Sequence, residues 1–425
     1  AYTPYTDQAV LYNSKSGFLE NDEDWKKYQQ DYILNFKKVF GEHSLTLTGG
    51  FTTYYYGNFQ RQVLVKQGTG PSDLPIPNDP RLWYMNSGFG VIDPTINADG
   101  GTYSGQGEAA TVSYLARALY NYKGKYYLNA SFRDDASSQI PEKNRHQQFW
   151  ALGGAWEISK ENFMENQKIF DFIKLKGSIG VLGNQTTNQD NVTPVNFNYP
   201  FYPALTTGTA AVFGTNVINA AKNAYKPNPD LKWETVDASE IGIELNAFQN
   251  RLHFEANYFN KTTHNLMTYV DRGSLGLDNE LINGGTLRNW GEEFSATWTQ
   301  QLSKDLSIDI GGNITFLKNT VVSLAADLPE GVLIRGFQNN GSAEARTFPG
   351  HPVGSFFGYI VDGLYQSNMD ILKSPSASSI GTYRAGDFKF RDVNGDGEIT
   401  AADRTVIGNP SPKFMYGGSI NVNFK

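Results

Sequence analysis

The feature that most constrains this chain is a strict alternation of apolar and polar residues, repeated in one segment after another. In residues 306–316, Ile308 and Ile310 alternate with Ser307 and Asp309. The same pattern recurs in the segments 125–133, 150–159, 173–181 and 414–425. Because successive side chains of a β-strand point to opposite faces, this period of two predicts strands with one apolar and one polar face. About a dozen such strands are expected, several of them near the ~9–11 residues that a tilted strand needs to cross a bilayer.

The composition agrees with an all-β fold and excludes several classes of function. The 425 residues include 24 Tyr, 27 Phe and 43 Gly, a mixture that suits many strands and turns. The net charge of −7 leaves no basic stripe for phosphates, so nucleic acid is not an expected partner. The chain has no cysteine, which excludes disulfides and thiolate metal sites. It also has no apolar run of about 18 residues, which excludes a transmembrane helix but not a transmembrane barrel.

The connections between the expected strands alternate between very short and very long. Tight turns are expected at Gly41–Glu42, Lys123–Gly124, Gln249–Asn250 and Ser303–Lys304. Long polar loops are expected at about 67–108, 184–230, 264–287 and 319–382. This asymmetry is typical of outer-membrane barrels, which have tight periplasmic turns and long extracellular loops. A soluble β-sandwich would also alternate, but its loops would not lengthen on one side only.

The two faces differ in a way that suits lipid on one side and a water-filled lumen on the other. The residues expected to face lipid are Leu128, Phe132, Leu175, Ile308, Ile310, Ile420 and Val422. Those expected to face the lumen are Asn129, Lys176, Asp309 and Asn421. Aromatic residues near strand ends are expected to form girdles at the membrane interfaces, namely Tyr120, Tyr122, Tyr126, Trp233 and Trp290. Singly, each of these aromatics is also explained by the general preference of aromatic residues for strands.

Several segments resemble the motifs of one transporter family. In chain order they are 132–138 (FRDDASS), 174–185 (KLKGSIGVLGNQ), 228–235 (NPDLKWET), 352–366 (PVGSFFGYIVDGLYQ) and 386–414 (GDFKFRDVNGDGEITAADRTVIGNPSPKF). These motifs and their order resemble those of the SusC/RagA family of TonB-dependent outer-membrane transporters, with Ala136 where Gly is usual. The resemblance extends over roughly 110–425, and residues 1–109 agree in pattern only.

The resemblance implies an all-β fold, an antiparallel transmembrane β-barrel of about 22 strands with a plug domain in its lumen. Residues 1–425 would supply about a dozen of these strands, and no segment of the sequence corresponds to the plug. An open sheet of this size would leave two unpaired edges in the bilayer, and the chain begins at Ala1 without a signal-like segment. We therefore expect a processed or clipped part of a larger barrel, whose remaining strands and plug are its partners together with the lipid bilayer.

The segment 392–403 matches an EF-hand-type calcium loop, with oxygen ligands at positions 1, 3, 5, 7 and 12 and Gly397 at position 6. The expected ligands are Asp392, Asn394, Asp396, Glu398 through its backbone carbonyl, and Asp403. Asp403 is shorter than the usual Glu at position 12, so modest affinity is expected. The expected role of Ca²⁺ is structural, in stiffening an outer loop. The alternative is an ordinary turn whose Asp and Asn side chains bond their own backbone.

The sequence gives little support to catalysis, and no enzyme is expected. The five histidines show no paired metal-binding spacing, and there is no nucleophile elbow or phosphate-binding loop. The adjacent carboxylates Asp134/Asp135 and Glu292/Glu293 would point to opposite faces of their strands, so neither pair would converge on a substrate. Aromatic residues that could instead stack sugars or grip peptide side chains are Tyr54–Tyr56, Trp83, Tyr84, Tyr199, Phe201, Tyr202 and Phe356–Phe357.

The resemblance implies a function in energised import of oligomeric nutrients, either glycans or oligopeptides. It further implies a SusD-like surface lipoprotein that covers the barrel, the TonB complex that supplies work, and a location in the outer membrane of a Gram-negative bacterium. Two alternatives remain at this stage. One is a passive porin or structural outer-membrane barrel. The other is a soluble carbohydrate-binding or carbohydrate-cleaving β protein.

Overall fold

The structure is a computed structural model, and it describes residues 17–67, 76, 79–83, 91–92, 102–187, 198–213, 216–270, 280–325, 328 and 345–424. The chain divides into two compact units. The smaller consists of Ala1–Tyr32 with Thr52–Val112, and the larger of Ile33–Phe51 with Ser113–Lys425. Strands dominate the described residues, whereas helix α1 (Asn368–Lys373) is a short segment of six residues. No described helix is long and apolar enough to span a membrane.

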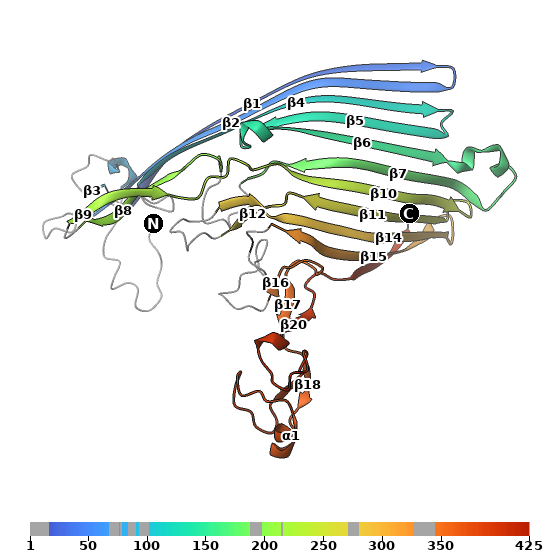
Figure 1. Cartoon of the computed structure of the whole chain (residues 1–425). Coiled ribbons are helices and arrows are strands. Elements are labelled where there is room, and N and C mark those ends of the chain that lie inside the picture. The colour runs from blue at the N-terminus through green and yellow to red at the C-terminus, as the bar shows by residue number, and fades with distance from the viewer. Residues whose placement is uncertain are drawn as a thin grey trace. The chain divides into compact units, whose positions relative to one another are not determined.

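One sheet organises the fold, and its strands lie side by side in chain order (Figure 1). Its main strands are β1 (Gly17–Phe40), β2 (His43–Lys66), β4 (Tyr103–Tyr122), β5 (Tyr126–Ser137), β6 (His146–Glu157), β7 (Phe170–Asn184), β10 (Glu234–Ala247), β11 (Leu252–His264), β14 (Gly285–Gln301), β15 (Leu306–Leu324) and β21 (Phe414–Phe424). From β5 to β21 each neighbouring pair is antiparallel. The short strand β3 (Val91–Ile92) adds to β2, which makes 12 strands. The all-β antiparallel architecture predicted from the alternation is therefore confirmed.

Short turns join the strands at one end of the sheet, which we call the turn end. All four predicted tight turns lie there, and Gly41 and Gly124 adopt φ values of 59° and 64° that favour glycine. The turn between β6 and β7 is longer, because it contains two 3₁₀ helices, η4 (Ile158–Lys160) and η5 (Asn162–Met164).

Long connections lie at the opposite end, which we call the loop end. Outside the strands they cover 67–102, 138–145, 185–233, 265–284 and 325–413. The predicted range 319–382 differs most, because β15 continues to Leu324 and the connection then runs on to β21. Asn319 and Thr320 pair with Asn289 and Arg288 of β14. At this end of β15, Asn319 and Thr320 are both polar and Val321 and Val322 are both apolar, so the alternation that revealed the other strands is missing.

The long connections carry small elements of their own. They are β8 (Leu205–Phe213), β9 (Asn216–Asn223), β12 (Met267–Val270), β13 (Glu280–Asn283), β16 (Ala345–Arg346), β17 (Ser355–Gly358), β18 (Val361–Leu364), β19 (Phe388–Phe390) and β20 (Thr405–Gly408). They form separate small sheets, β8 with β9, β12 with β13, β16 with β17 and β20, and β18 with β19. Residues 68–75, 77–78, 84–90, 93–101, 188–197, 214–215, 271–279, 326–327 and 329–344, which include Tyr84, lie outside the described residues.

The register of the sheet gathers the apolar side chains on one face. Ile310 of β15 lies opposite Trp298 of β14 and Ile420 of β21. Phe132 of β5 likewise lies opposite Trp150 of β6. Because directly paired residues share a face, these contacts continue from strand to strand as one band. We call the side that carries this band the apolar face, and the opposite side the polar face.

The side chains of the apolar face are not packed into a closed core. Of the seven residues predicted to face lipid, Ile308 is half-buried and the other six are exposed, from 38% for Leu175 to 72% for Ile420. The two hydrophobic clusters that the structure describes in the larger unit instead lie at the loop end. The prediction that this set stays out of a protein core is therefore confirmed.

Aromatic rings lie along the turn end of the apolar face. Tyr122 stacks on Tyr126 at 6.2 Å, and Tyr126 stacks on Trp156 at 6.5 Å, as expected of a girdle. Nearer the loop end, Lys318 lies over the ring of Trp290 at 5.8 Å. Trp233 was wrongly placed in a girdle, because it is only 4% exposed and belongs to a hydrophobic core. Its position at the start of a strand resembles that of an interfacial residue, and the sequence does not reveal the loops that cover it.

The smaller unit contains the parts of β1, β2 and β4 nearer the loop end, together with the connection that follows β2. Phe18, Val65 and Ile76 form its small hydrophobic core. The ring of Trp83 stacks on Phe18 with the centroids 5.8 Å apart and the planes inclined by 7°. Trp83 is thus engaged within the chain, which weakens its candidacy as a substrate-stacking residue.

Candidate functional site

The polar face of the larger unit carries linked charged and polar side chains, which we call the polar wall. At its centre, the Lys176 ammonium on β7 contacts the Glu255 carboxylate on β11 at 2.5 Å. Asn257 donates its side-chain N–H to the same carboxylate at 3.0 Å. Lys176 and Asp309, both predicted to face the lumen, belong to this wall.

A glycine makes the central contact possible, because Lys176 and Glu255 lie on strands separated by β10. Gly242 of β10 lies opposite both Lys176 and Asn257. A Cβ atom at this position would lie 2.0 Å from Asn257 Oδ1 and 3.0 Å from Lys176 Cε. Glycine therefore leaves the space in which the lysine crosses the strand. An isolated glycine inside a strand pattern is a sequence signal for such close approach, and it would have pointed to this position.

Further links extend the polar wall across the neighbouring strands. Asp309 accepts hydrogen bonds from Thr299 Oγ1 at 2.8 Å and from Asn423 Nδ2 at 2.9 Å. At its other side, Arg133 donates to Ser113 Oγ at 3.2 Å and pairs with Asp135 at 3.0 Å. These groups offer donors and acceptors of both signs, and each charged group named here already has an ion-pair or hydrogen-bond partner.

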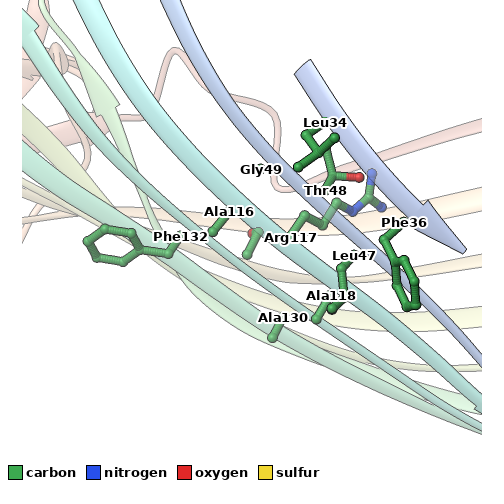
Figure 2. A pocket seen from close by; sticks show the side chains of 11 residues that line it. Leu34, Phe36, Leu47, Thr48, Gly49, Ala116, Arg117, Ala118, Ala130 and Phe132 are labelled. Carbon is green, nitrogen blue, oxygen red and sulfur yellow. The ribbon is translucent and has the colours of Figure 1, made fainter. Parts of the chain in front are cut away.

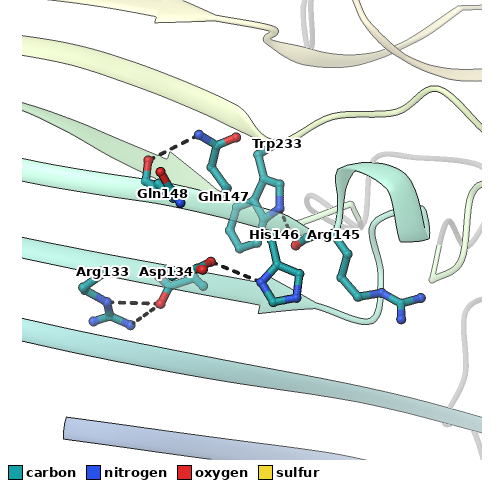
Figure 3. Close-up of polar contacts among 8 residues, drawn as sticks. Arg133, Asp134, Arg145, His146, Gln147, Gln148 and Trp233 are labelled. Atoms are coloured by element: carbon teal, nitrogen blue, oxygen red, sulfur yellow. Dashed lines mark hydrogen bonds and ion pairs between the residues drawn. The ribbon is translucent and has the colours of Figure 1, made fainter.

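The adjacent carboxylates Asp134 and Asp135 take separate partners, as their opposite facing predicts. Asp134 Oδ1 lies 3.2 Å from Nδ1 of His146 (Figure 3). Asp135 pairs instead with Arg133 at 3.0 Å. They do not converge on a common point. The pair therefore does not form a two-carboxylate acid–base site.

The buried residues at the loop end form what we call the loop core. Its members are Ile140, Phe149, Tyr225, Leu231, Trp233, Met267 and Leu281. They come from three different connections and from the strand ends beside them. The sequence did not predict this core, because its residues are far apart in the chain and no local periodicity joins them.

The NPDLKWET motif at 228–235 supplies the centre of the loop core. Leu231 is fully buried, and Trp233 donates its indole N–H to the carbonyl oxygen of Arg145 at 3.0 Å (Figure 3). Asn228 donates its side-chain N–H to the carbonyl of Leu281 at 2.9 Å, and Lys143 forms an ion pair with Asp230. Each of these contacts joins one connection to another, so the motif acts as a structural clamp.

Two of the predicted aromatic groups differ in their availability to a ligand. Phe201 and Tyr202 lie with their ring centroids 4.5 Å apart, Tyr199 contacts both rings, and Tyr202 is 61% exposed. Phe357 is instead covered, with the guanidinium of Arg346 4.1 Å from its ring centroid. The Tyr199–Phe201–Tyr202 group is therefore the better surface for stacking.

The predicted calcium loop is a tight turn held by its own backbone. Asp392 accepts from the N–H groups of Gly395 at 2.6 Å and Gly397 at 2.8 Å, and Asp396 accepts from the N–H of Glu398 at 2.9 Å. Asn394 donates its side-chain N–H to Asp396 at 2.8 Å. Among the residues that the structure describes, no three His, Asp or Glu side chains are grouped so that they could hold a metal ion. Calcium thus stays a prediction from the motif.

Asp403 closes this loop from a fully buried position. The N–H of Thr400, at 2.8 Å, is the main cause of the lowered pKa of the Asp403 carboxyl, and the N–H groups of Val393 and Asn394 add to it while burial opposes it. A lowered pKa means that this carboxylate stabilises the fold above the ordinary aspartate pKa. That stabilisation is lost as the pH falls through the lowered value.

With the sheet, the polar wall and the loop core described, comparison with known proteins decides the family. Residues 1–405 match the model of the family described as TonB dependent receptor-like, beta-barrel. The chain belongs to this family. Members of it are outer-membrane proteins, and the alternating strands and long loop-end connections agree with that assignment.

Curated relatives and a solved structure agree with the family. The chain is 28% identical over 417 residues to TonB-dependent receptor P26 of Formosa agariphila, covering 94% of this chain and 38% of that protein. It is 24% identical over 408 residues to TonB-dependent receptor SusC of Bacteroides thetaiotaomicron, covering 91% of this chain and 38% of SusC. The structure of the RagAB peptide transporter matches with a TM-score of 0.70 and 19% identity, over 97% of this chain and 41% of that one. The resemblance to SusC and RagA is thus confirmed, and the chain spans about two fifths of these relatives.

The loop core generates a prediction about the long connections. Trp233→Ala should remove about 3–5 kcal/mol of packing from the loop core, the usual range for a buried Trp replaced by Ala. Limited proteolysis should then cut 138–145, 185–233 and 265–284 faster. The sheet should stay folded, which is measured as an unchanged electrophoretic mobility of the unheated sample. Tyr202→Ala, an exposed aromatic in the same connection, is the matched control and should leave cleavage unchanged. Equal cleavage in both variants would show that the core does not hold these connections.

Proposed function

We propose that this chain forms much of the wall of a TonB-dependent outer-membrane importer for oligomeric nutrients, either glycans or oligopeptides. The single observation that carries the proposal is the two-faced sheet. One face exposes a continuous apolar band and the other carries the hydrogen-bonded polar wall. Lipid suits the first surface and a hydrated passage suits the second.

The orientation of the sheet follows from its two ends. The turn end, with its short turns and stacked aromatic rings, is assigned to the periplasmic side. The loop end, with the loop core and the small sheets, is assigned to the extracellular side. The long connections then lie where a nutrient and a SusD-like surface lipoprotein would arrive. The names of SusC and of the RagAB peptide transporter support this partner and peptides as one substrate class.

The two alternatives are less well supported. A soluble carbohydrate-binding protein would not leave Ile310, Ile420 and Val422 more than half exposed on one continuous face, since water contact with so much apolar surface is unfavourable. A passive porin does not require membership of a family named for its dependence on TonB. Active import is therefore the proposed role, and the TonB complex is its proposed source of work.

We place the first contact with substrate at Tyr199, Phe201 and Tyr202. Tyr202 presents a ring that is largely exposed and backed by Phe201, so stacking on it requires little rearrangement. Aromatic faces stack both on sugar rings and on peptide side chains, so the proposal covers both substrate classes.

Uptake by cells that carry the whole transporter tests the proposal. Labelled oligopeptides and labelled oligosaccharides are supplied separately, with and without a protonophore. We expect uptake of one class, its loss when the proton gradient collapses, and about a threefold decrease for Tyr202→Ala at low substrate concentration. Phe163→Ala, an exposed aromatic of the turn end, is the control and should leave uptake unchanged. Uptake that persists without the gradient would identify a passive pore.

We also propose that the loop 392–403 binds Ca²⁺ as a structural ion. Asp392, Asn394 and Asp396 stand at alternate positions of one turn, and positive φ values at Gly395 (77°) and Gly397 (85°) allow its sharp bend. The carboxylates of Asp392, Asp396 and Asp403 repel one another unless a cation or N–H donors neutralise them. The ion would take over the carboxylate oxygens that the loop N–H groups now occupy.

Calcium binding predicts a change in protection of the loop. Adding Ca²⁺ to the chelated protein should slow proteolysis within 386–410, and Asp396→Ala should abolish that effect while the sheet remains folded. Asp387→Asn, a neighbouring acid outside the ligand set, is the control and should respond like the wild type. If chelation and Asp396→Ala both leave the cleavage rate unchanged, these carboxylates are ordinary turn residues.

A further inference from the structure

The apolar face of the larger unit contains a groove close to its first strands (Figure 2). It has a volume of about 570 Å³ and is open to the outside. The residues that line it come from β1, β2, β4 and β5. The apolar ones are Leu34, Phe36, Leu47, Gly49, Ala116, Ala118, Ala130 and Phe132, and the polar Thr48, Arg117 and Ser131 alternate with them along their strands. A volume of this size is in the range of pockets that hold one small ligand, about 300–1,000 Å³.

The register of the first hairpin places large residues at one side of the groove. The two-residue turn at Gly41–Glu42 sets Phe36 opposite Leu47 and Leu34 opposite Gly49. A hydrogen bond of 2.7 Å from Thr48 to Asn35, on the other face, agrees with this register.

The next strands add small residues to the same rows. The backbone hydrogen bond from Lys123 N–H to the carbonyl of Glu42, at 2.8 Å, places Gly49 beside Ala116 and Leu47 beside Ala118, and the 5.1 Å ring contact of Phe51 with Tyr114 agrees with this register. On β5, Ala130 and Phe132 belong to the apolar band described above.

The result is a hollow with a small-residue floor and bulky rims. Gly49, Ala116, Ala118 and Ala130 form the floor over three neighbouring strands. Leu34 and Phe36 rise on one side, and Phe132, which is 43% exposed, rises on the other. The Phe51–Tyr114 pair closes the groove towards the loop end, and the stacked rings of the turn end close it below. A long, narrow apolar chain fits this shape.

A lysine of β1, Lys38, lies between the groove and the turn end. Lys38 alternates with Leu34 and Phe36 on β1, so it shares their face, and it lies three residues before Gly41. It is exposed, and none of the described residues forms an ion pair with it. At the same end, Lys123, Lys125 and Lys160 are paired with carboxylates at 3.0, 3.3 and 3.0 Å. Lys38 is therefore available to a phosphate at the membrane interface.

We infer that this groove binds one phospholipid of the periplasmic leaflet, with an acyl chain on the small-residue floor and the phosphate at Lys38. The inference rests on the proposed orientation of the sheet. The groove is continuous with the apolar face, so lipid hydrocarbon surrounds it in this orientation. The positive charge of Lys38 complements the negative charge of a phosphate. A second copy of the chain is less suited, because a stable interface buries about 800 Å² on each partner and the groove accommodates far less.

Native mass spectrometry of the assembled transporter in mild detergent tests the inference, with phosphatidylglycerol as the added probe. We expect one retained lipid per protein. Replacing Ala118 and Ala130 together by Leu fills the floor and should abolish retention. Lys38→Ala should lower it about fivefold, the usual contribution of one lysine near anionic lipid, and Lys38→Arg should restore it. Ala256→Leu makes the same change on the apolar face away from the groove, and it should retain the lipid as the wild type does.

The outcomes separate this inference from the proposed function. Equal retention by the filled-groove variant would overturn it, because the lipid would then be ordinary boundary lipid. Loss of a dimer in that variant, with unchanged lipid, would also overturn it and would identify a second copy as the occupant. Retention of lipopolysaccharide in place of phosphatidylglycerol would overturn the assigned leaflet. Because Lys38 is exposed, Lys38→Ala should not disturb folding, and its lipid retention still tests the inference if the double variant does not fold. Nutrient uptake measured with the same variants tests the proposed transporter function separately from lipid retention.

Discussion

The fold depends on a constraint that the bilayer places on the backbone. Inside hydrocarbon no water is available to N–H and C=O groups, so each must be satisfied within the sheet. The antiparallel ladder from β5 to β21 does this strand by strand, and its register carries the apolar band with it. A slip of one residue would transfer Ile310 and its neighbours to the polar face, so the register and the burial pattern determine each other. The remaining features are additions to this ladder.

Two additions adapt the ladder to a larger assembly. On the polar face, Gly242 gives up a side chain so that Lys176 can reach Glu255 across an intervening strand. At the loop end, the residues around Trp233 join three connections that would otherwise be held only at their strand ends. The first feature keeps charges matched along a hydrated surface, and the second fixes the position of loops that face incoming nutrient in the proposed orientation. Gly242 and the residues around Trp233 thus both serve contacts between segments that are distant in sequence.

The alternating strands were predictable from sequence, because the order of apolar and polar residues in each strand shows which side chains share a face. The tight turns near Gly41 and Gly124 were equally readable, since their residues favour positive φ. The end of β15 near Asn319 was not predictable, because two polar residues are followed there by two apolar ones and the alternation is lost. The loop core was missed for a different reason: Leu231 and Trp233 are buried by loops that no local pattern places over them. Calcium binding at Asp392 stays a prediction from the sequence motif.

The central claim is that the two faces of one sheet meet two different solvents. Spin labels placed singly along 306–316 of the assembled protein in lipid vesicles measure this directly, through collisions with oxygen, which concentrates in lipid, and with a water-soluble nickel complex. Labels at Ile308, Ile310 and Ile314 should collide mainly with oxygen, and labels at Ser307, Asp309 and Asn313 mainly with nickel, with a period of two. Equal exposure of both sets to nickel, without alternation, would contradict the account and would favour a soluble sheet.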